Sequence, residues 1–447
     1  MISINLNPNS ADNTGIDVTS VVDQIVQSES AQEVQWQQQR TVFQQQAAQL
    51  KSMQNSLGTL KTSVDALQDV LGALSAMQVT SSQPTVVTAS AQAGAIAGTH
   101  LVTVGNLATT SSYYTDAVSS SSATLTPGSF TLQLGSGPGT VVTIDSTNNT
   151  PDKLASYING QNWGVSASVI TDANGARLAL LSNTAGVSGD LTISNNNTGL
   201  AFHKSTTGVN AALTVDGVPI SSASNTVAGA IAGVTLNLTN ASAGSAVALT
   251  VAANTGKARQ AVSDFVAGYN SVMTAINAQF AVDPATNKQG ILAGSSAVRT
   301  LQTSLLTNVT YAISGNNGLV NLASIGVDMA NDGTLSIDSA KLDDALANHF
   351  DNFKNLFQGA NGTGFAQAFS TQLGKMGSSV DGLLVMGLNE NTSSQRMLTD
   401  AINDFEDRMA VRRQDLIRQY SQIDTMLRQY PLLMAQITGQ LASLPKS

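Results

Sequence analysis

The sequence predicts an α+β multidomain protein. Long terminal heptad helices are expected to form a stalk or leg with a helical domain, and β-rich antiparallel head domains are expected to be inserted between them. Apolar residues recur every seven positions near both ends of the 447-residue chain, alternate through its middle and return to helical spacing after residue 255. The β zone separates the two heptad segments. The chain can therefore leave the stalk along the first segment and return along the second, so that its two ends pack side by side.

The N-terminal heptad helix, which would form stalk and leg, is expected over residues 17–78, after a flexible segment at 1–16. Asp17 or Thr19 can cap its start. The seam residues, spaced by seven with a second series three residues later, are Trp36, Phe43, Leu50, Met53, Leu57, Leu60, Val64, Leu67, Leu71 and Leu74. Gln39 and Gln46 occupy seam positions in the first part, so this half is expected to fray or to wait for a partner.

The head is expected between residues 79 and 255. It divides into the first part of a β domain (79–120), an inserted β domain with one short helix (121–208) and the second part of the first domain (209–255). Glycine-containing turns predict hairpins with tips at residues 135–139 and 172–175. Thr150, Pro151 and Gly160 are the expected cap, first residue and stop of the short helix.

A helical leg domain with a β-hairpin is expected over residues 256–390. Its hairpin should turn at Asp332 and Gly333, and its helices are expected at residues 257–280, 295–313 and 338–357.

A C-terminal heptad helix is expected over residues 391–447. Pro431 interrupts its pattern, and a proline inside a helix removes a hydrogen bond and costs about 3 kcal/mol. A kink, or a tail that orders only on assembly, is therefore expected there.

Both seams are longer than an ordinary globular core requires, which favours a partner interface. The candidate coiled-coil and assembly interface comprises Leu50, Leu57, Leu60, Val64, Leu67, Leu71, Ile402, Met409, Leu416, Ile423, Leu427 and Ile437.

The composition argues against several classes of partner. Charged residues make up 11% of the chain and its net charge is −9, whereas nucleic acids and anionic lipids are bound by clustered Lys and Arg. No stretch approaches the roughly 20 apolar residues that span a bilayer, so neither nucleic-acid binding nor membrane insertion is expected. The chain has no cysteine, which excludes disulfides, cysteine nucleophiles and cysteine-based metal sites.

No constellation of residues predicts an enzyme, a metal site or a cofactor site. His100, His203 and His349 lie in different zones, without acidic or histidine neighbours at ligand spacing. The stretches "DANGA" and "DMANDG" lack the carboxylate pattern of a calcium loop and are expected to be hairpin turns. Asp343 and Asp344 are adjacent on a helix and cannot face each other, so they predict a solvated surface.

A series of segments resembles the flagellar filament cap proteins, also called flagellar hook-associated protein 2. "GIDVTSVVDQIVQSES" resembles the start of that family and "GTHLVTVGNLATTSSY" its next element, while "NTPDKLASYINGQNWGVSASVITDANGARLALLSNTAG" is similar to a repeat that cap proteins share with some flagellins. "VSDFVAGYNSVMTAIN", "GILAGSSAVRTLQTSL" and "LASIGVDMANDGTLSIDSAKLDDAL" are similar to blocks of the family's C-terminal half. These matches follow the family's order over nearly the whole chain.

The resemblance implies a non-catalytic protein at the distal tip of the bacterial flagellum, where it would promote flagellin folding and polymerisation, prevent loss of flagellin monomers and so support motility. The implied partners are further copies of the chain in a ring-like homo-oligomer (pentamer and hexamer both stay open), flagellin, a flagellar export chaperone and the hook-associated junction proteins. The opening "MISINLNPNSADNTG" lacks the basic and apolar regions of a secretory signal. The resemblance therefore implies secretion through the flagellar type III system without a cleaved signal peptide.

Two alternatives stay open. An extracellular adhesin would use its Ser- and Thr-rich head for cell adhesion, by binding host mucin or glycans, and an isolated fragment of residues 80–255 would then bind mucin. Another structural protein of the flagellar axis, such as a hook–filament junction protein or an atypical flagellin, would be found at a place other than the filament tip.

Overall fold

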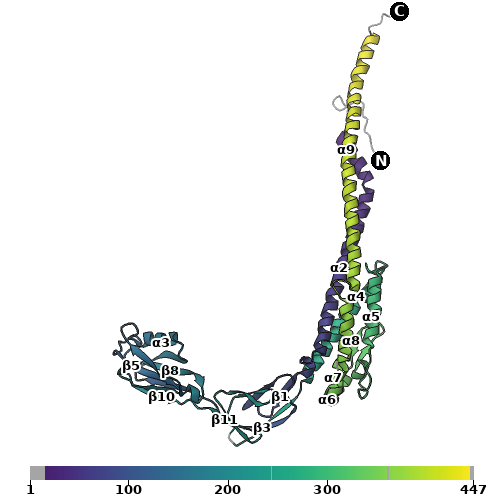
Figure 1. The fold of residues 1–447 in the computed structure, drawn as a ribbon. Coiled ribbons are helices and arrows are strands. Elements are labelled where there is room, and N and C mark those ends of the chain that lie inside the picture. The colour runs from purple at the N-terminus through teal and green to yellow at the C-terminus, as the bar shows by residue number, and fades with distance from the viewer. Residues whose placement is uncertain (1–15, 243, 360–361, 443–447) are drawn as a thin grey trace, which may run out of the picture. The chain divides into compact units, whose positions relative to one another are not determined.

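The computed structural model describes residues 16–242, 244–359 and 362–442, and the chain divides into two compact units. The helical unit comprises residues 1–65, 263–342 and 359–447, and the sheet unit comprises residues 66–262 and 343–358. Figure 1 labels the elements of both units. The N-terminal segment 1–15, whose role in export the sequence predicts, lies outside the described residues.

The N-terminal heptad segment forms two helices, α1 (Val18–Glu29) and α2 (Ala31–Gln68), where a single one was expected. Asp17 caps α1 by accepting a hydrogen bond from the Ser20 amide at 3.1 Å. At the break, the Ser30 hydroxyl donates to the Val26 carbonyl at 2.9 Å and competes with the backbone ladder. After α2, the Asp69 carboxylate accepts the Leu71 amide at 2.9 Å and turns the chain out of the helix.

The third zone is helical, as predicted, with two short hairpins. Its elements are α4 (Thr255–Phe280), β16 (Val282–Asp283), β17 (Lys288–Gln289), α5 (Ser296–Val309), β18 (Val327–Met329), β19 (Leu335–Ile337), α6 (Ser339–Asn348), α7 (Phe350–Gln358), α8 (Phe365–Met376) and α9 (Leu383–Ala442). The predicted turn at Asp332 and Gly333 joins β18 to β19 and is confirmed.

The helix expected at residues 338–357 is wrong as a single element, because α6 and α7 meet at His349. The His349 amide closes α6 by donating to the Ala345 carbonyl at 3.1 Å, and its own carbonyl accepts the Phe353 amide at 2.9 Å, which starts α7. Helix α8 was not predicted from the sequence.

An aromatic cluster forms the core of the helical unit. Phe265 and Tyr269 of α4 meet Phe365 and Phe369 of α8, and Phe265 lies edge-on to Phe369 with ring centroids 6.0 Å apart. All four side chains are at most 1% exposed.

The sheet unit contains two antiparallel β cores. In the first, a five-stranded sheet in the order β1-β15-β3-β11-β12 and a three-stranded sheet in the order β13-β14-β2 share one apolar core. Their strands are β1 (Met77–Ser81), β2 (Val87–Ala91), β3 (Gly98–Asn106), β11 (Ala211–Val215), β12 (Val218–Ser222), β13 (Thr226–Ile231), β14 (Val234–Leu238) and β15 (Val247–Ala253). Because β1 to β3 and β11 to β15 come from separate stretches, the second core is an insertion into the first.

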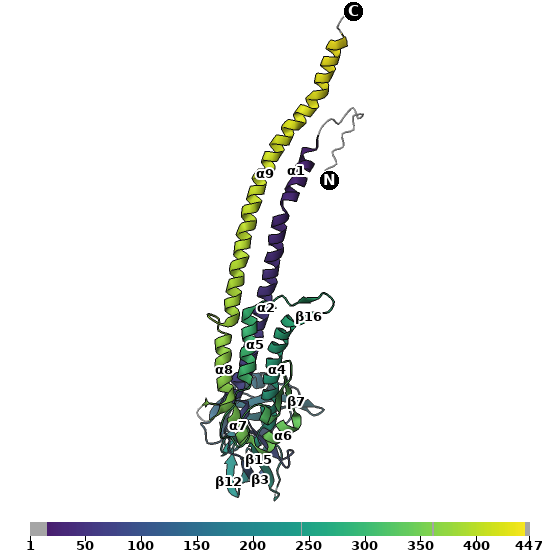
Figure 2. The same ribbon diagram turned by 90° about the vertical axis from the view of Figure 1, so that its right-hand side faces the viewer.

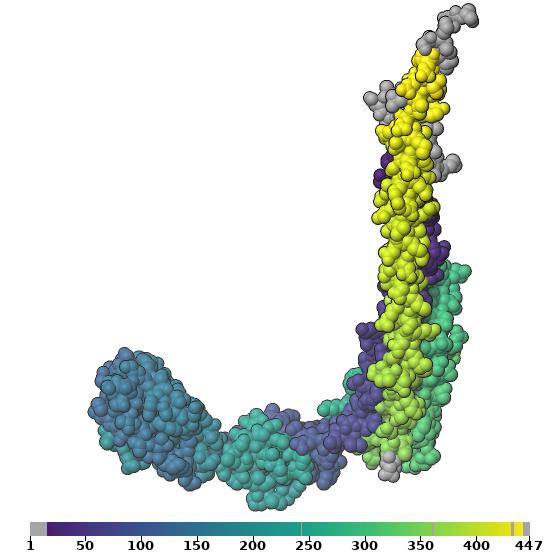
Figure 3. All heavy atoms as spheres, turned by 45° about the horizontal axis from the view of Figure 1, so that its top comes forward, coloured from purple at the N-terminus to yellow at the C-terminus, as the bar shows by residue number. Residues whose placement is uncertain are grey.

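The second core packs α3 (Pro151–Gly160) with a four-stranded sheet, β10-β4-β8-β7, and a three-stranded sheet, β6-β5-β9. Its strands are β4 (Thr110–Thr115), β5 (Gly128–Leu134), β6 (Thr140–Ile144), β7 (Val165–Asp172), β8 (Gly175–Ala185), β9 (Leu191–Ser194) and β10 (Phe202–Thr206). The strand β4 pairs here with β8, although it precedes the expected start of the inserted domain at residue 121. In Figure 3 the two cores are separate lobes.

Local predictions for the second core are confirmed. Residues 135–139 connect β5 to β6, and Asp172 pairs with Gly175 at the turn between β7 and β8. The Thr150 hydroxyl caps α3 by accepting the Lys153 amide at 3.3 Å, with Pro151 in the first turn.

Candidate assembly interface

The predicted seam of α2 is buried within its own chain. Leu50, Leu57, Leu60, Val64 and Leu67 are each at most 3% exposed. These residues therefore build the core that holds α2 in place. Their part in an interface with other molecules remains a proposal.

Close backbone approaches explain why glycines face this seam. A Cβ added to Gly268 of α4 would lie 3.3 Å from the Leu60 Cα, and one added to Gly387 of α9 would lie 3.5 Å from Leu50 Cδ1. At Gly268 the obstacle is backbone, which cannot move aside without shifting a helix. Small residues here let α4 and α9 come close to α2.

Leu71 differs from the rest of the predicted α2 seam. It lies after the end of α2 and is 71% exposed. The heptad count continues through it in sequence, but the turn at Asp69 removes it from the helix face.

The first part of the α9 seam is covered by α1 and α2. Ile402 and Leu416 are buried and Met409 is half-buried. The indole of Trp36 on α2 lies edge-on to Phe405 of α9, with ring centroids 5.9 Å apart. Figure 2 shows α1 and α9 side by side.

Ion pairs fix α1 to α9. Arg413 lies 2.9 Å from the Asp23 carboxylate, and Arg412 lies 3.5 Å from Glu29. These pairs are exposed, so each contributes at most about 1 kcal/mol to stability. Their main effect is to set which residues of the two helices lie opposite each other.

Asp424 ends this pairing. Its carboxylate accepts hydrogen bonds from the Arg428 guanidinium and from the Ile16 amide, both at 2.8 Å. The Arg428 bond first, and then the Ile16 amide, hold the pKa of Asp424 below its usual value. The carboxylate thus stays ionised and joins the start of the described chain to α9.

From Ile423 onward the α9 seam loses its cover. Ile423, Leu427 and Ile437 are 43%, 40% and 48% exposed, respectively. Their helix face also carries other exposed large apolar residues, and we call the whole set the tail stripe: Ile423, Met426, Leu427, Tyr430, Leu433, Met434 and Ile437. The helix continues across Pro431 to Ala442, so the proline does not end it.

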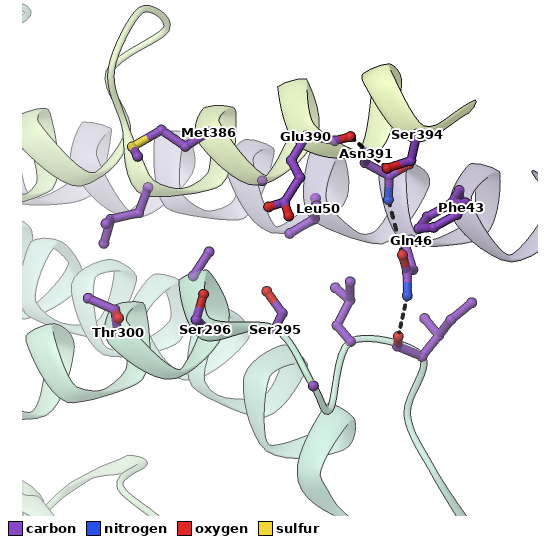
Figure 4. A pocket seen from close by; sticks show the side chains of 16 residues that line it. Phe43, Gln46, Leu50, Ser295, Ser296, Thr300, Met386, Glu390, Asn391 and Ser394 are labelled. Carbon is purple, nitrogen blue, oxygen red and sulfur yellow. Dashed lines mark hydrogen bonds between the residues drawn. The ribbon is translucent and has the colours of Figure 1, made fainter. Parts of the chain in front are cut away.

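A groove opens where α2, α5 and α9 meet, with a volume of about 710 Å³. Gln46, one of the predicted weak points of the seam, lies at one end of it (Figure 4). Its carboxamide accepts a hydrogen bond from the buried Asn391 amide and donates one to the Ile291 carbonyl, both at 3.1 Å. The amide is satisfied and joins three segments, so the expected fraying is not seen at this position.

The same groove contains a carboxylate. Glu390 projects from α9 toward the first turn of α5, which Ser295 and Ser296 begin (Figure 4). Within the described parts of the chain, the Glu390 side chain has no hydrogen bond or ion pair.

Titratable clusters elsewhere are small. His100 lies 2.7 Å from Asp216, and His203 lies 3.0 Å from Asp116. Neither pair was predicted, because its members are far apart in the sequence and only the pairing of strands brings them together. Over the described residues, no group of three or more His, Asp or Glu side chains could hold a metal ion, and no helix combines the length and apolarity that a membrane span requires.

Comparisons with known proteins agree with this architecture. The family described as "Flagellar hook-associated protein 2 C-terminus" matches residues 208–431, "Flagellar hook-associated protein 2 N-terminus" matches residues 14–111, and "Flagellin hook IN motif" matches residues 129–184. The last match falls within the inserted β core.

Full-length relatives and a solved structure extend the match. The chain is 30% identical over 433 residues to the B-type flagellar hook-associated protein 2 of Pseudomonas aeruginosa, covering 87% of this chain and 89% of that protein. It is 28% identical over 472 residues to the flagellar hook-associated protein 2 of Escherichia coli K12, covering 96% of each. The crystal structure of the D1-D2-D3 domains of the flagellar cap protein FliD from Escherichia coli matches with a TM-score of 0.60 at 27% identity, covering 77% of this chain and 99% of that one. The chain therefore belongs to the flagellar hook-associated protein 2 family, the proteins that cap the tip of the bacterial flagellar filament.

Proposed function

We propose that this chain caps the growing tip of a flagellar filament as a homo-oligomer and holds incoming flagellin there through the tail stripe of α9. The observation that carries this proposal is the change in burial along one helix face. Ile402 and Leu416 are covered by the chain's own helices, whereas Tyr430, at 64% exposure, and Ile437, at 48%, continue the same seam without cover.

The chemistry of the tail stripe suits a partner that is itself a helix with an apolar face. Apolar side chains at alternating spacings of three and four form a continuous strip along a helix, and a second amphipathic helix covers such a strip by packing its own apolar side chains into it. Between Thr425 and Ala442 the only charged residue is Arg428. The strip therefore offers apolar contact with little charge selectivity, which suits repeated binding of identical subunits.

The proposed work is templating rather than catalysis. Binding at the tip would keep a newly arrived flagellin chain from diffusing away while it folds and inserts. The cap would then release the subunit, because its affinity for flagellin would be high only during insertion. The buried residues of the candidate interface would act indirectly, by keeping α2 and α9 in place.

We also propose that the protein leaves the cell unfolded through the flagellar type III export channel. The absence of cysteine from all 447 residues supports this route, because no disulfide can lock the chain before it is threaded.

The test compares two double variants with the same new side chains. Tyr430→Ser with Ile437→Ser removes apolar surface from the tail stripe, while Gln429→Ser with Gln436→Ser places the same residues about 100° around α9, at polar positions outside the stripe. Each purified protein is added to cells that lack the gene, which avoids any effect on export. The partition of flagellin between filaments and culture supernatant is then measured.

The wild-type protein and the glutamine variant should restore filaments, whereas the stripe variant should leave most flagellin in the supernatant. Equal restoration by both variants would show that the tail stripe does not hold flagellin. If no version changes the partition of flagellin, the capping proposal itself is wrong for this chain.

A further inference from the structure

The β16–β17 hairpin is a regular hairpin that projects from the helical unit and is exposed along its whole length. All residues from 281 to 289 are exposed, including Val282 at 51%. Lys288 near its tip has no ion pair within the described parts of the chain. Nothing in the core of the helical unit requires such a projection.

The hairpin is nevertheless held in one conformation. The Asp283 carboxylate accepts hydrogen bonds from the Ala285 amide at 2.8 Å and from the Thr286 hydroxyl at 2.9 Å. At the base of the hairpin, the backbone carbonyl of Gln279 accepts a hydrogen bond from the Gly290 amide at 3.1 Å. The buried side chain of Gln279 accepts another from the Leu292 amide at 3.2 Å. An exposed hairpin braced at both ends loses little entropy on binding.

The groove between α2, α5 and α9 has an apolar and negatively charged lining, which is complementary to the hairpin. Its walls carry the apolar side chains of Phe43, Ile291 and Met386, and Glu390 supplies a negative charge without a partner in the described residues. Its volume of about 710 Å³ lies in the range of pockets that enclose a ligand. The hairpin offers an apolar side chain, Val282, and a cation, Lys288, which match this lining, although the strand register places Lys288 opposite Asp283 of the same hairpin.

The two features face different ways. Figure 2 shows the β16–β17 hairpin projecting from the helical unit on the side away from α9, whereas the groove is bounded by α9. One chain therefore cannot easily fill its own groove with its own hairpin. A donor and an acceptor on different sides of one protomer define a heterologous contact, which gives a ring where the repeated rotation returns to the first copy.

We propose that the hairpin of one copy docks in the groove of the next copy, with Lys288 of the first paired to Glu390 of the second. This contact goes beyond the proposed capping function, because it assigns residues of the helical unit to self-association. It requires neither flagellin nor the sheet unit.

The absence of cysteine allows a direct test by cross-linking. Full-length Lys288→Cys and Glu390→Cys proteins are prepared separately, mixed without flagellin and treated with a short bismaleimide. One protein of each mixture carries a tag that changes its size, so that a mixed dimer on a denaturing gel can be told from the two homodimers and reports a link between the two positions in different chains. The matched control mixes Lys288→Cys with Glu406→Cys, an exposed glutamate elsewhere on α9.

The Glu390 mixture should give a mixed dimer and the Glu406 mixture should give little or none. Equal yields from the two mixtures, or no product from either, would overturn the proposal. Because flagellin is absent from this experiment, its failure would leave the capping test unaffected.

Charge reversal gives a second measurement on the same pair. Lys288→Glu and Glu390→Lys should each weaken self-association by about two- to fivefold per contact, as measured by sedimentation, because an exposed pair is lost and like charges are opposed. The double variant Lys288→Glu/Glu390→Lys should restore association, and Lys51→Glu is the charge-matched control. A double variant as weak as the singles would overturn the pairing. Loss of flagellin retention with unchanged self-association would assign the groove to flagellin instead and would overturn it equally.

Discussion

Replacing Tyr269 by Phe should stabilise the helical unit. The side chain is fully buried among Phe265 and Phe369, and its hydroxyl has no hydrogen-bond partner among the described residues. A buried hydroxyl without a partner costs about 1–3 kcal/mol in measured proteins. Phenylalanine keeps the ring and its packing, so the free energy of unfolding should rise by about 1 kcal/mol or more.

The same burial makes stability depend on alkaline pH. It raises the pKa of Tyr269 well above its ordinary value of 10.0. Above pH 10 the unfolded chain therefore loses the phenolic proton while the folded chain keeps it, which favours unfolding. The slope is about 1.4 kcal/mol per pH unit once the unfolded group is ionised, which gives a loss of about 1 kcal/mol between pH 10 and pH 11. Tyr269→Phe should lack this loss.

The assay is urea unfolding at pH 7, 10 and 11, followed by far-ultraviolet circular dichroism and by the emission of Trp36. The chain has two tryptophans, so a Trp163→Phe background leaves Trp36 as a reporter of the helical unit. Tyr311→Phe is the control, because that side chain is 39% exposed and its hydroxyl donates to the Thr363 carbonyl at 3.2 Å, so its removal should not stabilise the protein. A decrease of more than about 1 kcal/mol in the stability of Tyr269→Phe at pH 7 would refute the reasoning, because it would mean that the hydroxyl makes a favourable bond.

Two further predictions concern packing and acid stability. Leu60→Ala should lower the free energy of unfolding by about 2–5 kcal/mol, because Leu60 is fully buried. Leu71→Ala should change it by less than about 0.5 kcal/mol, because Leu71 is exposed. Equal effects of the two substitutions in thermal unfolding would contradict the assigned burial. Bonds from His100 and from the Leu101 amide lower the pKa of Asp216, so the stability that they give is present above the ordinary aspartate pKa and is lost as pH falls below about 4. In urea unfolding, Asp216→Asn should lose less stability than the wild type between pH 5 and pH 3, and an identical decline would contradict this.

The periodic parts of the fold were predictable from the sequence. The heptad spacing located α2 and α9, and turn residues such as Asp172 and Gly175 located the hairpins, because local chemistry determines both features. The missed helix α8 also carries a readable pattern, with Phe365, Phe369, Leu373 and Met376 on one face. It was not predicted because it is short and lies between glycine-containing segments.

Two features of the seams were not predicted, one set by a local turn and the other by distant residues. The heptad count treats Leu67 and Leu71 alike, but only Leu67 lies within α2, because the Asp69 carboxylate turns the chain after Gln68. The sequence analysis treated Gln46 as a defect, because nothing in the local pattern shows that Asn391 and the Ile291 carbonyl come from far along the chain to satisfy it.

The contact between the half-buried Gln46 amide and the buried Asn391 amide also determines how far α9 extends beyond its partner helices. Leucine seams tolerate sliding by one heptad, a displacement of about 10 Å, because every seventh residue is similar. Sliding here would separate the half-buried Gln46 carboxamide from the buried Asn391 amide and break the hydrogen bond between them, so one alignment of α2 with α9 is favoured over its neighbours. In that alignment Asp424 lies opposite Ile16, the first described residue, and no other described helix accompanies α9 beyond this point. The hydrogen bond between Gln46 and Asn391 thus sets how many residues of α9 extend beyond Asp424.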